Sequence, residues 1–342
     1  MTASRMELSR RSLMAGAAAA YLGNGALLRG TERRTSMGLA TDSVPTRRRM
    51  ATADFVDLVG EWGMGGVQAP LSSLDSAYAQ KVRARLEKWE LFLIVSTSIN
   101  DLDRFRQTVA LAKEAGALGV RVPSGGRRYE DFSTLAERQA HVAAVRERLR
   151  LAIPVAEAAK LPIALENHKD FTLEEEVRLL KEYSSEYFGA CVDTGNNLAL
   201  LDDPMDVVEQ LAPFAVTTHL KDATLEEYED GFLLGDIPLG EGMMDLPRVV
   251  QTLKKHHPKL PILLECITRN PLRIPCLTDQ YWATFPERNG LFLARALKLA
   301  RANKPRWQIS IPPNTESGEL ERQETKNVEM CVAYARDKLG LT

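Results

Sequence analysis

The 342-residue sequence predicts an α/β fold, a (β/α)₈ barrel formed by a single domain, and two observations favour it. From residue 36 to residue 302, short apolar runs alternate with amphipathic helical patterns, over a length typical of eight βα units. A doubly wound sheet is the competing fold, but no G-x-G-x-x-G run follows the first strand and no Walker glycine run is present. The barrel is therefore the predicted fold.

Eight short apolar runs predict the barrel strands. These runs are expected to end near Thr41, Ala69, Thr97, Pro123, Glu166, Asp193, His219 and Glu265. Each is bounded by turn-forming or helix-starting residues, which is typical of buried parallel strands. The eight runs account for one complete barrel.

Helix-start signals lie between the strands. The eight helices are expected to open near Thr52, Leu74, Asp101, Ser133, Thr172, Asp203, Asp245 and Asn289. The segment Thr172-Leu173-Glu174-Glu175 fits a capping box, in which a hydroxyl and a carboxylate satisfy free amides. Residues 223–244 are expected to form an extended loop before the seventh helix.

The chain is divided into three segments. Residues 1–35 are expected to be a signal-like or disordered segment, residues 36–304 the catalytic barrel, and residues 305–342 a C-terminal extension. In that extension, Pro305 to Pro313 predicts an extended connection. Glu319 to Leu339 predicts an extra amphipathic helix on the barrel exterior or against a partner subunit, so a homo-oligomer is one possibility.

Composition excludes several classes of protein. Apolar residues make up 44% and charged residues 26%, which rules out disorder, collagen and coiled coil as whole-chain descriptions. The net charge of −2 provides no basic field for a nucleic-acid backbone, so no nucleic-acid partner is expected. No run of 18 apolar residues occurs, so no membrane span is expected.

The N-terminal segment predicts export. Ser9-Arg10-Arg11-Ser12 precedes a weakly apolar, alanine-rich stretch, and this pattern resembles a twin-arginine signal. The expected location is therefore the periplasm or the exterior. If the segment is instead a disordered tail or a misassigned start, the protein is cytoplasmic.

The four cysteines do not decide the compartment. Cys191, Cys266, Cys276 and Cys331 form no C-x-x-C pair and no zinc-finger spacing, which favours buried packing thiols. A disulfide between Cys266 and Cys276 is an open alternative.

Four consecutive strands of the predicted barrel end in a metal-competent side chain. Glu166, Asp193, His219 and Glu265 each follow an apolar run. The first two spacings, 27 and 26 residues, are each close to one βα unit, and the third, 46 residues, includes the long loop. Because barrel active sites lie at the C-terminal ends of the strands, the four side chains are expected to converge there.

Three neighbouring carboxylates in such a place need a cation or protons, because a buried unpaired charge costs several kcal/mol. Oxygen ligands with one imidazole and no thiolate favour one divalent ion, Mn²⁺ first, with Mg²⁺, Co²⁺ or Zn²⁺ as alternatives. For each residue alone, a surface salt bridge or a hydrogen bond at the rim is the alternative.

Four segments carry a family resemblance: Glu166-Asn167-His168, Asp193-Thr194-Gly195-Asn196, His219-Leu220-Lys221-Asp222 and Leu264-Glu265. Over about residues 36–302 they resemble the xylose-isomerase-like TIM-barrel superfamily (sugar phosphate isomerases and epimerases), which also includes inosose dehydratases and endonuclease IV. The resemblance implies one divalent cation on Glu166, Asp193, His219 and Glu265, with Glu166 and Glu265 as the acid–base pair.

That pair has a clear chemical use. Removing a proton next to a carbonyl is slow because the resulting enediolate is high in energy, and a divalent ion stabilises the developing charge. Two carboxylates on opposite faces of the substrate can then remove and return the proton. Return to the same carbon gives epimerisation, and return to the neighbouring carbon gives aldose–ketose isomerisation.

Four further residues are predicted to contact a carbohydrate substrate. His168 and Lys221 each lie two positions beyond a ligand, on the same side of an extended strand. For His168 the alternative is a hydrogen bond that supports a ligand, and for Lys221 it is a salt bridge to Asp222 or Glu241. Asn196 stands where some ketose epimerases carry a substrate-contacting histidine, so their sugar preference is not carried over. Arg269 is either an anion contact or an ordinary loop arginine.

Other functions remain open. A metal-dependent lyase or dehydratase acting on a keto sugar or a 3-keto-glycoside uses the same ion and base, so the residues do not separate it from an isomerase. A non-catalytic sugar-binding barrel is the hypothesis from another class. A DNA-repair enzyme like endonuclease IV is not expected, because five histidines are too few for its three-zinc site.

Overall fold

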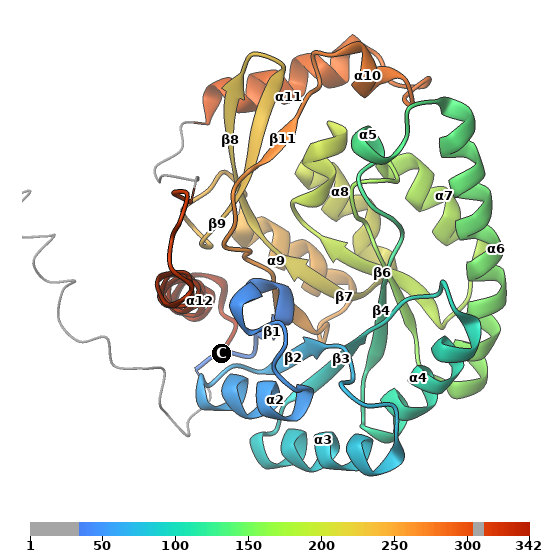
Figure 1. The fold of residues 1–342 in the computed structure, drawn as a ribbon, viewed down its shortest axis with the longest axis vertical. Coiled ribbons are helices and arrows are strands. Elements are labelled where there is room, and N and C mark those ends of the chain that lie inside the picture. Colours follow the sequence, from blue (N-terminus) through green and yellow to red (C-terminus); the bar gives the residue numbers. More distant parts are fainter. Residues whose placement is uncertain (1–33, 304–310) are drawn as a thin grey trace, which may run out of the picture.

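The computed structural model describes residues 34–303 and 311–342, and the eight predicted strands close into one parallel barrel (Figure 1). Around the barrel the strand order is β1-β10-β7-β6-β5-β4-β3-β2. The strands are β1 (Gly38–Ala40), β2 (Gly66–Ala69), β3 (Phe92–Ser96), β4 (Gly119–Pro123), β5 (Ile163–Glu166), β6 (Phe188–Asp193), β7 (Ala215–Leu220) and β10 (Ile262–Leu264). The predicted fold is confirmed.

Helices cover the outside of the barrel. They are α2 (Thr52–Glu61), α3 (Ser76–Trp89), α4 (Leu102–Glu114), α6 (Leu135–Ala159), α7 (Leu173–Tyr183), α8 (Pro204–Leu211), α9 (Leu246–His256) and α12 (Ser317–Leu339). The capping box at Thr172 is present, because its hydroxyl accepts from the Glu175 amide while the Glu175 carboxylate accepts from the Thr172 amide. Helix α6 begins with a second capping box, at Thr134.

The expectation of a loop at residues 223–244 is wrong for about the first two thirds of that range, residues 223–237. Residues Asp222–Tyr228 (β8) and Gly231–Ile237 (β9) form an antiparallel hairpin, to which Leu272–Ile274 (β11) adds a third strand. The run of acidic residues around the turn conceals the strands in the sequence. Leu225, Phe232 and other apolar side chains of the hairpin are nevertheless fully buried in a second small core, which explains the pairing.

The eighth helix of the outer layer is α12, not the helix predicted to begin at Asn289. That predicted helix, α11 (Gly290–Ala302), packs along β8 and contributes to the second core together with α10 (Asp279–Trp282). Helix α12 instead places Val328, Cys331 and Ala335 in the main core and contacts α9 (Figure 1). Residues 311–342 therefore complete the barrel's helical layer.

The short elements lie at the two ends of the strands. They are η1 (Thr41–Ser43), η2 (Pro45–Arg47), α5 (Arg128–Asp131), η3 (Asn196–Leu200) and η4 (Ala212–Phe214). The predicted export signal and most of the predicted connection Pro305 to Pro313 lie outside the described residues. Within the described residues, no helix is both long enough and apolar enough to span a bilayer.

All four cysteines are buried and free. A hydrogen bond with Cys331 on α12, together with burial, raises the pKa of Cys266 well above its usual value. The pairing of Cys266 with Cys276, left open above, is absent from this structure.

Candidate metal centre

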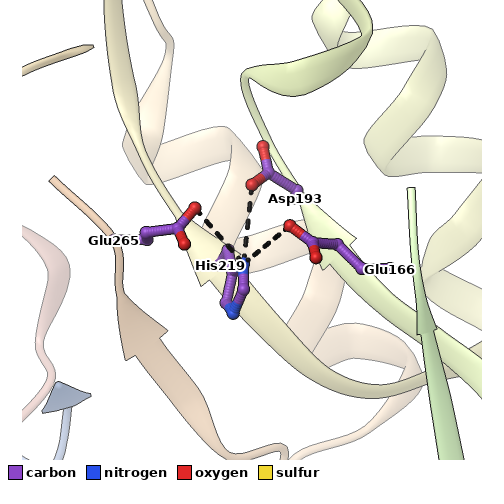
Figure 2. A group of neighbouring side chains, drawn as sticks. All are labelled: Glu166, Asp193, His219 and Glu265. Atoms are coloured by element: carbon purple, nitrogen blue, oxygen red, sulfur yellow. Dashed lines mark hydrogen bonds and ion pairs between the residues drawn. The ribbon is translucent and has the colours of Figure 1, made fainter. Parts of the chain in front are cut away.

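The four predicted ligands meet at the C-terminal end of the barrel (Figure 2). Each offers one ligand atom, and these atoms all lie within 4.8 Å of one another. The Nδ1 atom of His219 lies 3.2 Å from Glu166 Oε1, 3.6 Å from Asp193 Oδ2 and 3.4 Å from Glu265 Oε2. All four side chains are buried, with residue exposures of 3% or less.

Strand register brings the ligands to one level. Glu166 is the last residue of β5 and Asp193 the last of β6, and in the parallel ladder Asp193 pairs with His219 of β7. Leu264 at the end of β10 pairs with Leu220, so Glu265 follows directly beyond the same level. The alternation of side chains along a strand then turns the four groups toward the barrel axis.

His219 is oriented by a residue that the sequence interpretation missed. Gln68, buried on β2, lies across the barrel with its amide 2.7 to 3.0 Å from His219 Nε2. When Nε2 donates to the Gln68 carbonyl oxygen, the lone pair of Nδ1 faces the three carboxylates. An outer partner of this kind fixes the tautomer and the orientation of a metal-binding imidazole.

Arg121 on β4 is the second missed residue. Its guanidinium forms a partly buried ion pair and hydrogen bond with the buried Glu166 Oε2. The signal in the sequence is a single arginine within the apolar run Gly119–Pro123, which fits a strand only if that side chain is paired inside the barrel. Burial alone raises the pKa of Glu166, but Arg121 and His219 outweigh burial and lower the pKa well below its usual value.

The loop after β6 fixes Asp193. Its Oδ1 accepts from the backbone amides of Gly195 and Asn196, at 2.9 and 2.8 Å, and the Asn167 side chain accepts from the Asp193 amide at 2.7 Å. Its Oδ2 is buried and, among the described residues, accepts no hydrogen bond, although the Lys221 ammonium lies 3.0 Å away. One oxygen is thus held by the backbone and the other points into the group of ligands.

Two of the predicted substrate contacts, Lys221 and Asn196, lie directly beside the ligands. Lys221 Nζ is 2.6 Å from Glu265 Oε2 and donates to Asn196 Oδ1 at 3.2 Å, so its ion-pair partners are Glu265 and Asp193 rather than Asp222. The Asp222 carboxylate instead accepts backbone amides of the loop that follows β9. Asn196 also donates to Glu166 Oε1 at 3.2 Å.

Lys169 was not predicted and joins the same network. It is buried, and its ammonium donates to Asn196 Oδ1, the atom that also accepts from Lys221. Burial, with the nearby Lys221 charge, lowers the pKa of Lys169 to about 8. Asn196 therefore connects two buried ammonium groups to the Glu166 carboxylate.

The other two predicted substrate contacts lie outside the group of ligands. His168 is two residues beyond the end of β5, and its Nδ1 pairs with the Gly126 carbonyl at 2.9 Å. Arg269 forms a 2.9 Å ion pair with Asp236 at the end of β9. The strand alternation used to place His168 does not apply to it, because the strand has already ended.

The donor set fits a hard divalent cation. Three carboxylates and one imidazole nitrogen, each offering an atom to a common centre, are ligands that Mn²⁺ and Mg²⁺ accept. Although burial acts in the opposite direction, the surrounding Cys191, Glu265 and Glu166 raise the pKa of His219 well above its usual value, so without a cation the ring holds a proton. A cation that binds His219 must displace that proton, so binding weakens as the pH falls.

Solved structures with the same barrel include enzymes and proteins of unassigned activity. D-psicose 3-epimerase from Clostridium cellulolyticum H10 superposes with a TM-score of 0.59 at 12% identity, covering 86% of this chain and 97% of that one. A xylose isomerase-like TIM barrel protein from Mycobacterium smegmatis, in complex with magnesium, superposes with a TM-score of 0.52 at 14% identity, covering 78% and 98%. At these identities the likeness shows the fold alone.

Two curated relatives are similar in sequence. The uncharacterized protein YihM of Escherichia coli is 26% identical over 212 residues, which are 58% of this chain and 60% of YihM, so the match spans about three fifths of that relative. The 3-oxo-isoapionate decarboxylase of Pectobacterium atrosepticum is 25% identical over 222 residues, 63% of this chain and 78% of the relative.

A family model gives the firmest assignment. The model described as xylose isomerase-like TIM barrel matches residues 56–284, about two thirds of the chain, and that range contains all four ligands together with Gln68 and Arg121. The match agrees with the closed eight-stranded barrel and with the resemblance in the four strand-end segments. The chain belongs to the xylose isomerase-like TIM barrel family.

Proposed function

We propose that the chain is a divalent-metal-dependent sugar isomerase or epimerase that moves a proton next to the carbonyl of a keto sugar. One observation carries the proposal, the buried convergence of three carboxylates on His219 Nδ1. Burying these carboxylates is costly unless a cation compensates their charge. Perturbed titratable groups gathered at the C-terminal end of a barrel are typical of active sites. A D-psicose 3-epimerase with the same fold supports the reaction class.

Each ligand has a proposed role. Asp193 and His219 hold the ion, since the loop amides and Gln68 fix them and leave one atom of each facing the centre. The bound ion supplies Lewis acidity, which stabilises negative charge on a carbonyl oxygen. Glu166 and Glu265, on either side of His219, hold the ion and exchange the proton with opposite faces of the substrate. Mn²⁺ is the favoured ion, and Mg²⁺ is the first alternative.

The polar neighbours bind the substrate in this proposal. Lys221 and Asn196 lie beside Glu265 and Glu166 respectively, so a hydroxyl group of a sugar bound at the ion can reach their nitrogen atoms. His168 lies in the loop that follows β5, and its pairing with the Gly126 carbonyl supports that loop. The cationic Lys221 also stabilises an enediolate as negative charge develops on it.

A specific observation favours a second candidate, a metal-dependent lyase. Glu166 is tied to Arg121, whereas Glu265 faces the ammonium of Lys221, so the two carboxylates are not equivalent as bases. A dehydratase removes the carbon-bound proton with one base and protonates the leaving hydroxyl with one acid, which releases water. A decarboxylase releases CO₂ and then protonates the enediolate that remains. Each needs one proton donor rather than two matched bases, and Lys221 fits that donor. The related 3-oxo-isoapionate decarboxylase supports this alternative, in which the substrate is a keto sugar acid or a 3-keto-glycoside.

Proton exchange in D₂O tests the proposal. With Mn²⁺ added, the wild type should introduce deuterium next to the carbonyl of at least one member of a panel of keto sugars, keto sugar acids and glycosides. Glu166→Gln and Glu265→Gln should lose turnover and keep most of the bound ion, while a mass-neutral product indicates isomerisation and loss of water, CO₂ or an aglycone indicates the lyase. Absence from the wild type of both exchange and any loss of water, CO₂ or an aglycone, with sugar binding retained in Glu265→Gln, would support a non-catalytic sugar-binding barrel and refute both candidates.

A further inference from the structure

A cavity of about 360 Å³ lies outside the metal centre, among the helices that follow β4 and β5. Its walls are α5, the first two turns of α6, the first turn of α7, and the segment from Phe285 to Phe292 that leads into α11. None of the four metal ligands lines it. The volume lies within the range of small-molecule sites, roughly 300–1,000 Å³, so the cavity has room for an organic molecule.

Three buried arginines lie in these walls. Arg128 on α5, Arg138 on α6 and Arg288 before α11 have side-chain exposures of 4% or less. Each guanidinium lies over a phenylalanine ring, 4.2 to 4.5 Å from the ring centroid. A ring covers one face of a guanidinium and leaves the N–H groups in its plane for other partners. The three cations are therefore removed from water but keep donors for an acceptor.

Two carboxylates that are mostly removed from water pair with the three guanidiniums. Glu175 Oε2 accepts from Arg128 Nη1 at 2.8 Å and from Arg138 Nη2 at 3.2 Å. The buried Asp202 accepts from Arg288 Nη2. Because Glu175 is shared by two arginines, one positive charge of the three is left without a carboxylate of its own.

Exposed acids do not supply the missing charge. The Glu174 side chain, 3.3 Å from Arg288, is 54% exposed, and that of Glu287 is 79% exposed, so solvent screens both. Burial, together with the charges of Arg138 and Arg288, lowers the pKa of Arg128 below its usual value, against the effect of its carboxylate partner. The wall of the cavity therefore carries an excess of positive charge.

Two of the arginines also have donors without a partner. The Nε and Nη1 atoms of Arg138 and of Arg288 are buried and, among the described residues, donate no hydrogen bond. An unsatisfied buried donor costs about 1–3 kcal/mol, and more when it belongs to a charged group. An anion with several acceptor oxygens satisfies such donors and neutralises the excess charge at the same time.

The rest of the wall is largely apolar. Leu135, Val142, Phe285 and Phe292 line the cavity beside the arginines. A bare inorganic ion leaves this apolar surface uncovered, whereas a molecule with one charged end and an apolar remainder covers both parts. Arg288 and Phe292 lie beyond residue 284, where the matched family range ends, so the family match does not account for this wall.

We propose that this cavity is a binding site, separate from the metal centre, for a small organic oxyanion: a carboxylate or phosphate monoester with an apolar remainder. The oxygens of the anion bind the guanidinium groups of Arg138 and Arg288, and the apolar remainder packs against Val142 and Phe292. Because the unpartnered nitrogens are covered by neighbouring atoms, the two guanidiniums rotate on binding, as side chains at binding sites commonly do. The inference does not depend on the proposed function.

Calorimetric titration of the Mn²⁺-loaded protein, freed of excess metal, tests the site with benzoate, phenyl phosphate and the neutral benzamide. At least one of the two anions should bind with a Kd of about 1 mM or lower, and the anion that binds identifies the charged group. Benzamide should bind at least about 10-fold more weakly. Arg288→Met should weaken the anion about 10- to 100-fold, because it removes charge-assisted hydrogen bonds. Val142→Phe, which keeps all three arginines, should weaken it by filling the cavity.

Two controls identify where the anion binds. Val155→Phe changes another half-buried valine of α6, outside the cavity, and should leave the affinity at the wild-type value. Asp193→Ala should also leave it unchanged, whereas an anion bound at the metal centre would be lost with the ion. Retained affinity in both controls, with weaker binding in Val142→Phe, supports the separate site.

Four results overturn the inference: neither anion binds, benzamide binds as well as the anions, binding disappears in Asp193→Ala, or Val142→Phe and Arg288→Met both bind like the wild type. The three arginines would then serve only to fasten α5, α6 and the segment before α11 to the barrel. None of these results bears on proton exchange at the metal centre, so the proposed function stands or fails separately.

Discussion

The two halves of the barrel contribute different parts of the metal centre. The half formed by β5, β6, β7 and β10 supplies the four ligands at its strand ends, and Lys221 beside them. The half formed by β1 to β4 supplies none of the ligands, but its Gln68 and Arg121 pair with His219 and Glu166. Gln68 therefore reaches His219 from a strand that is not its neighbour, whereas Arg121 reaches Glu166 from the adjacent strand.

The difference explains why the closed barrel is needed for the site. A strand-end ligand is positioned along the barrel by its own ladder, but its side chain is oriented by a further partner. For His219 that partner, Gln68, reaches across the interior. For Glu166 it is Arg121 on the adjacent strand. Closure brings β2 opposite β7, whereas β4 lies directly beside β5 in the sheet. Substitutions in the ligand half should therefore remove the ion, and substitutions in the supporting half should weaken or destabilise the site.

The largest effect is expected in the ligand half. Asp193→Ala removes one oxygen held by the loop and one that faces the centre, so the bound ion and the proton exchange should both be lost. The rate of exchange should fall by about 10³-fold or more, because a Lewis-acidic ion contributes several kcal/mol. His219→Ala should behave in the same way. Elemental analysis after gel filtration and the D₂O assay measure the two effects, and the exposed Asp206→Ala on α8 is the control.

In the supporting half, Arg121→Met leaves the Glu166 carboxylate buried and without its guanidinium partner. The free energy of unfolding of the metal-free protein at pH 7 should fall by about 3–5 kcal/mol. Because the folded-state pKa of Glu166 is lowered, its contribution is present above the unfolded-state value, about 4.3, and is lost as the pH falls through the folded-state pKa.

The deficit of Arg121→Met relative to wild type should thus shrink in acid, as urea unfolding at pH 7 and pH 4 would measure. Arg106→Met, which removes an exposed partner of Asp103 on α4, should cost little at either pH. An equal deficit for Arg121→Met at both pH values would exclude the ion pair as its cause.

The buried ammonium of Lys169, in the half of the barrel that supplies the ligands, is expected to lower the free energy of unfolding. Burial lowers the pKa of Lys169 to about 8, so between about pH 8 and pH 10.4 the unfolded state binds more protons than the folded state. The unfolding free energy of the wild type should therefore rise over this window relative to Lys169→Met, by up to about 3 kcal/mol. Denaturant titrations at pH 7.5 and pH 10 measure the change, with the exposed Lys81→Met expected to show none.

The smallest effect is expected at Gln68. Gln68→Leu keeps the size of the side chain and removes the partner of His219 Nε2, so the affinity for Mn²⁺ should fall about 10- to 100-fold while one ion still binds. Calorimetric titration of the metal-free variant measures this change. Gln139→Leu is the matched substitution outside the site, and an unaltered affinity in Gln68→Leu would show that His219 needs no support from β2.

These two halves also differ in how far the sequence predicted them. Glu166, Asp193, His219 and Glu265 form a repeated pattern, an apolar run followed by a ligand, and a repeat at βα spacing is visible without a structure. Gln68 and Arg121 are single polar residues inside apolar strands, and no repeat marks them. Their partners lie 151 and 45 residues away, so neither pairing is visible until the order of the strands in the barrel is known.

The same reasoning applies to the fold. Strands and helices of the βα units follow local periodicity and caps, and their order was predicted from residue 36 onward. The hairpin of β8 and β9 was missed because acidic residues interrupt its apolar pattern. The sequence contains two amphipathic helices in succession, α11 and α12, and either could complete the outer layer. Tertiary packing decides between them, because only the apolar face of α12 fits the main core.

Titration of chelator-treated protein with Mn²⁺, followed by the electron paramagnetic resonance signal of the free ion, tests the metal centre most directly. We predict one tightly bound ion per wild-type chain, bound more weakly at lower pH, and no comparable site in Asp193→Ala. Absence of a bound ion in the wild type, or equal binding in Asp193→Ala, would contradict it.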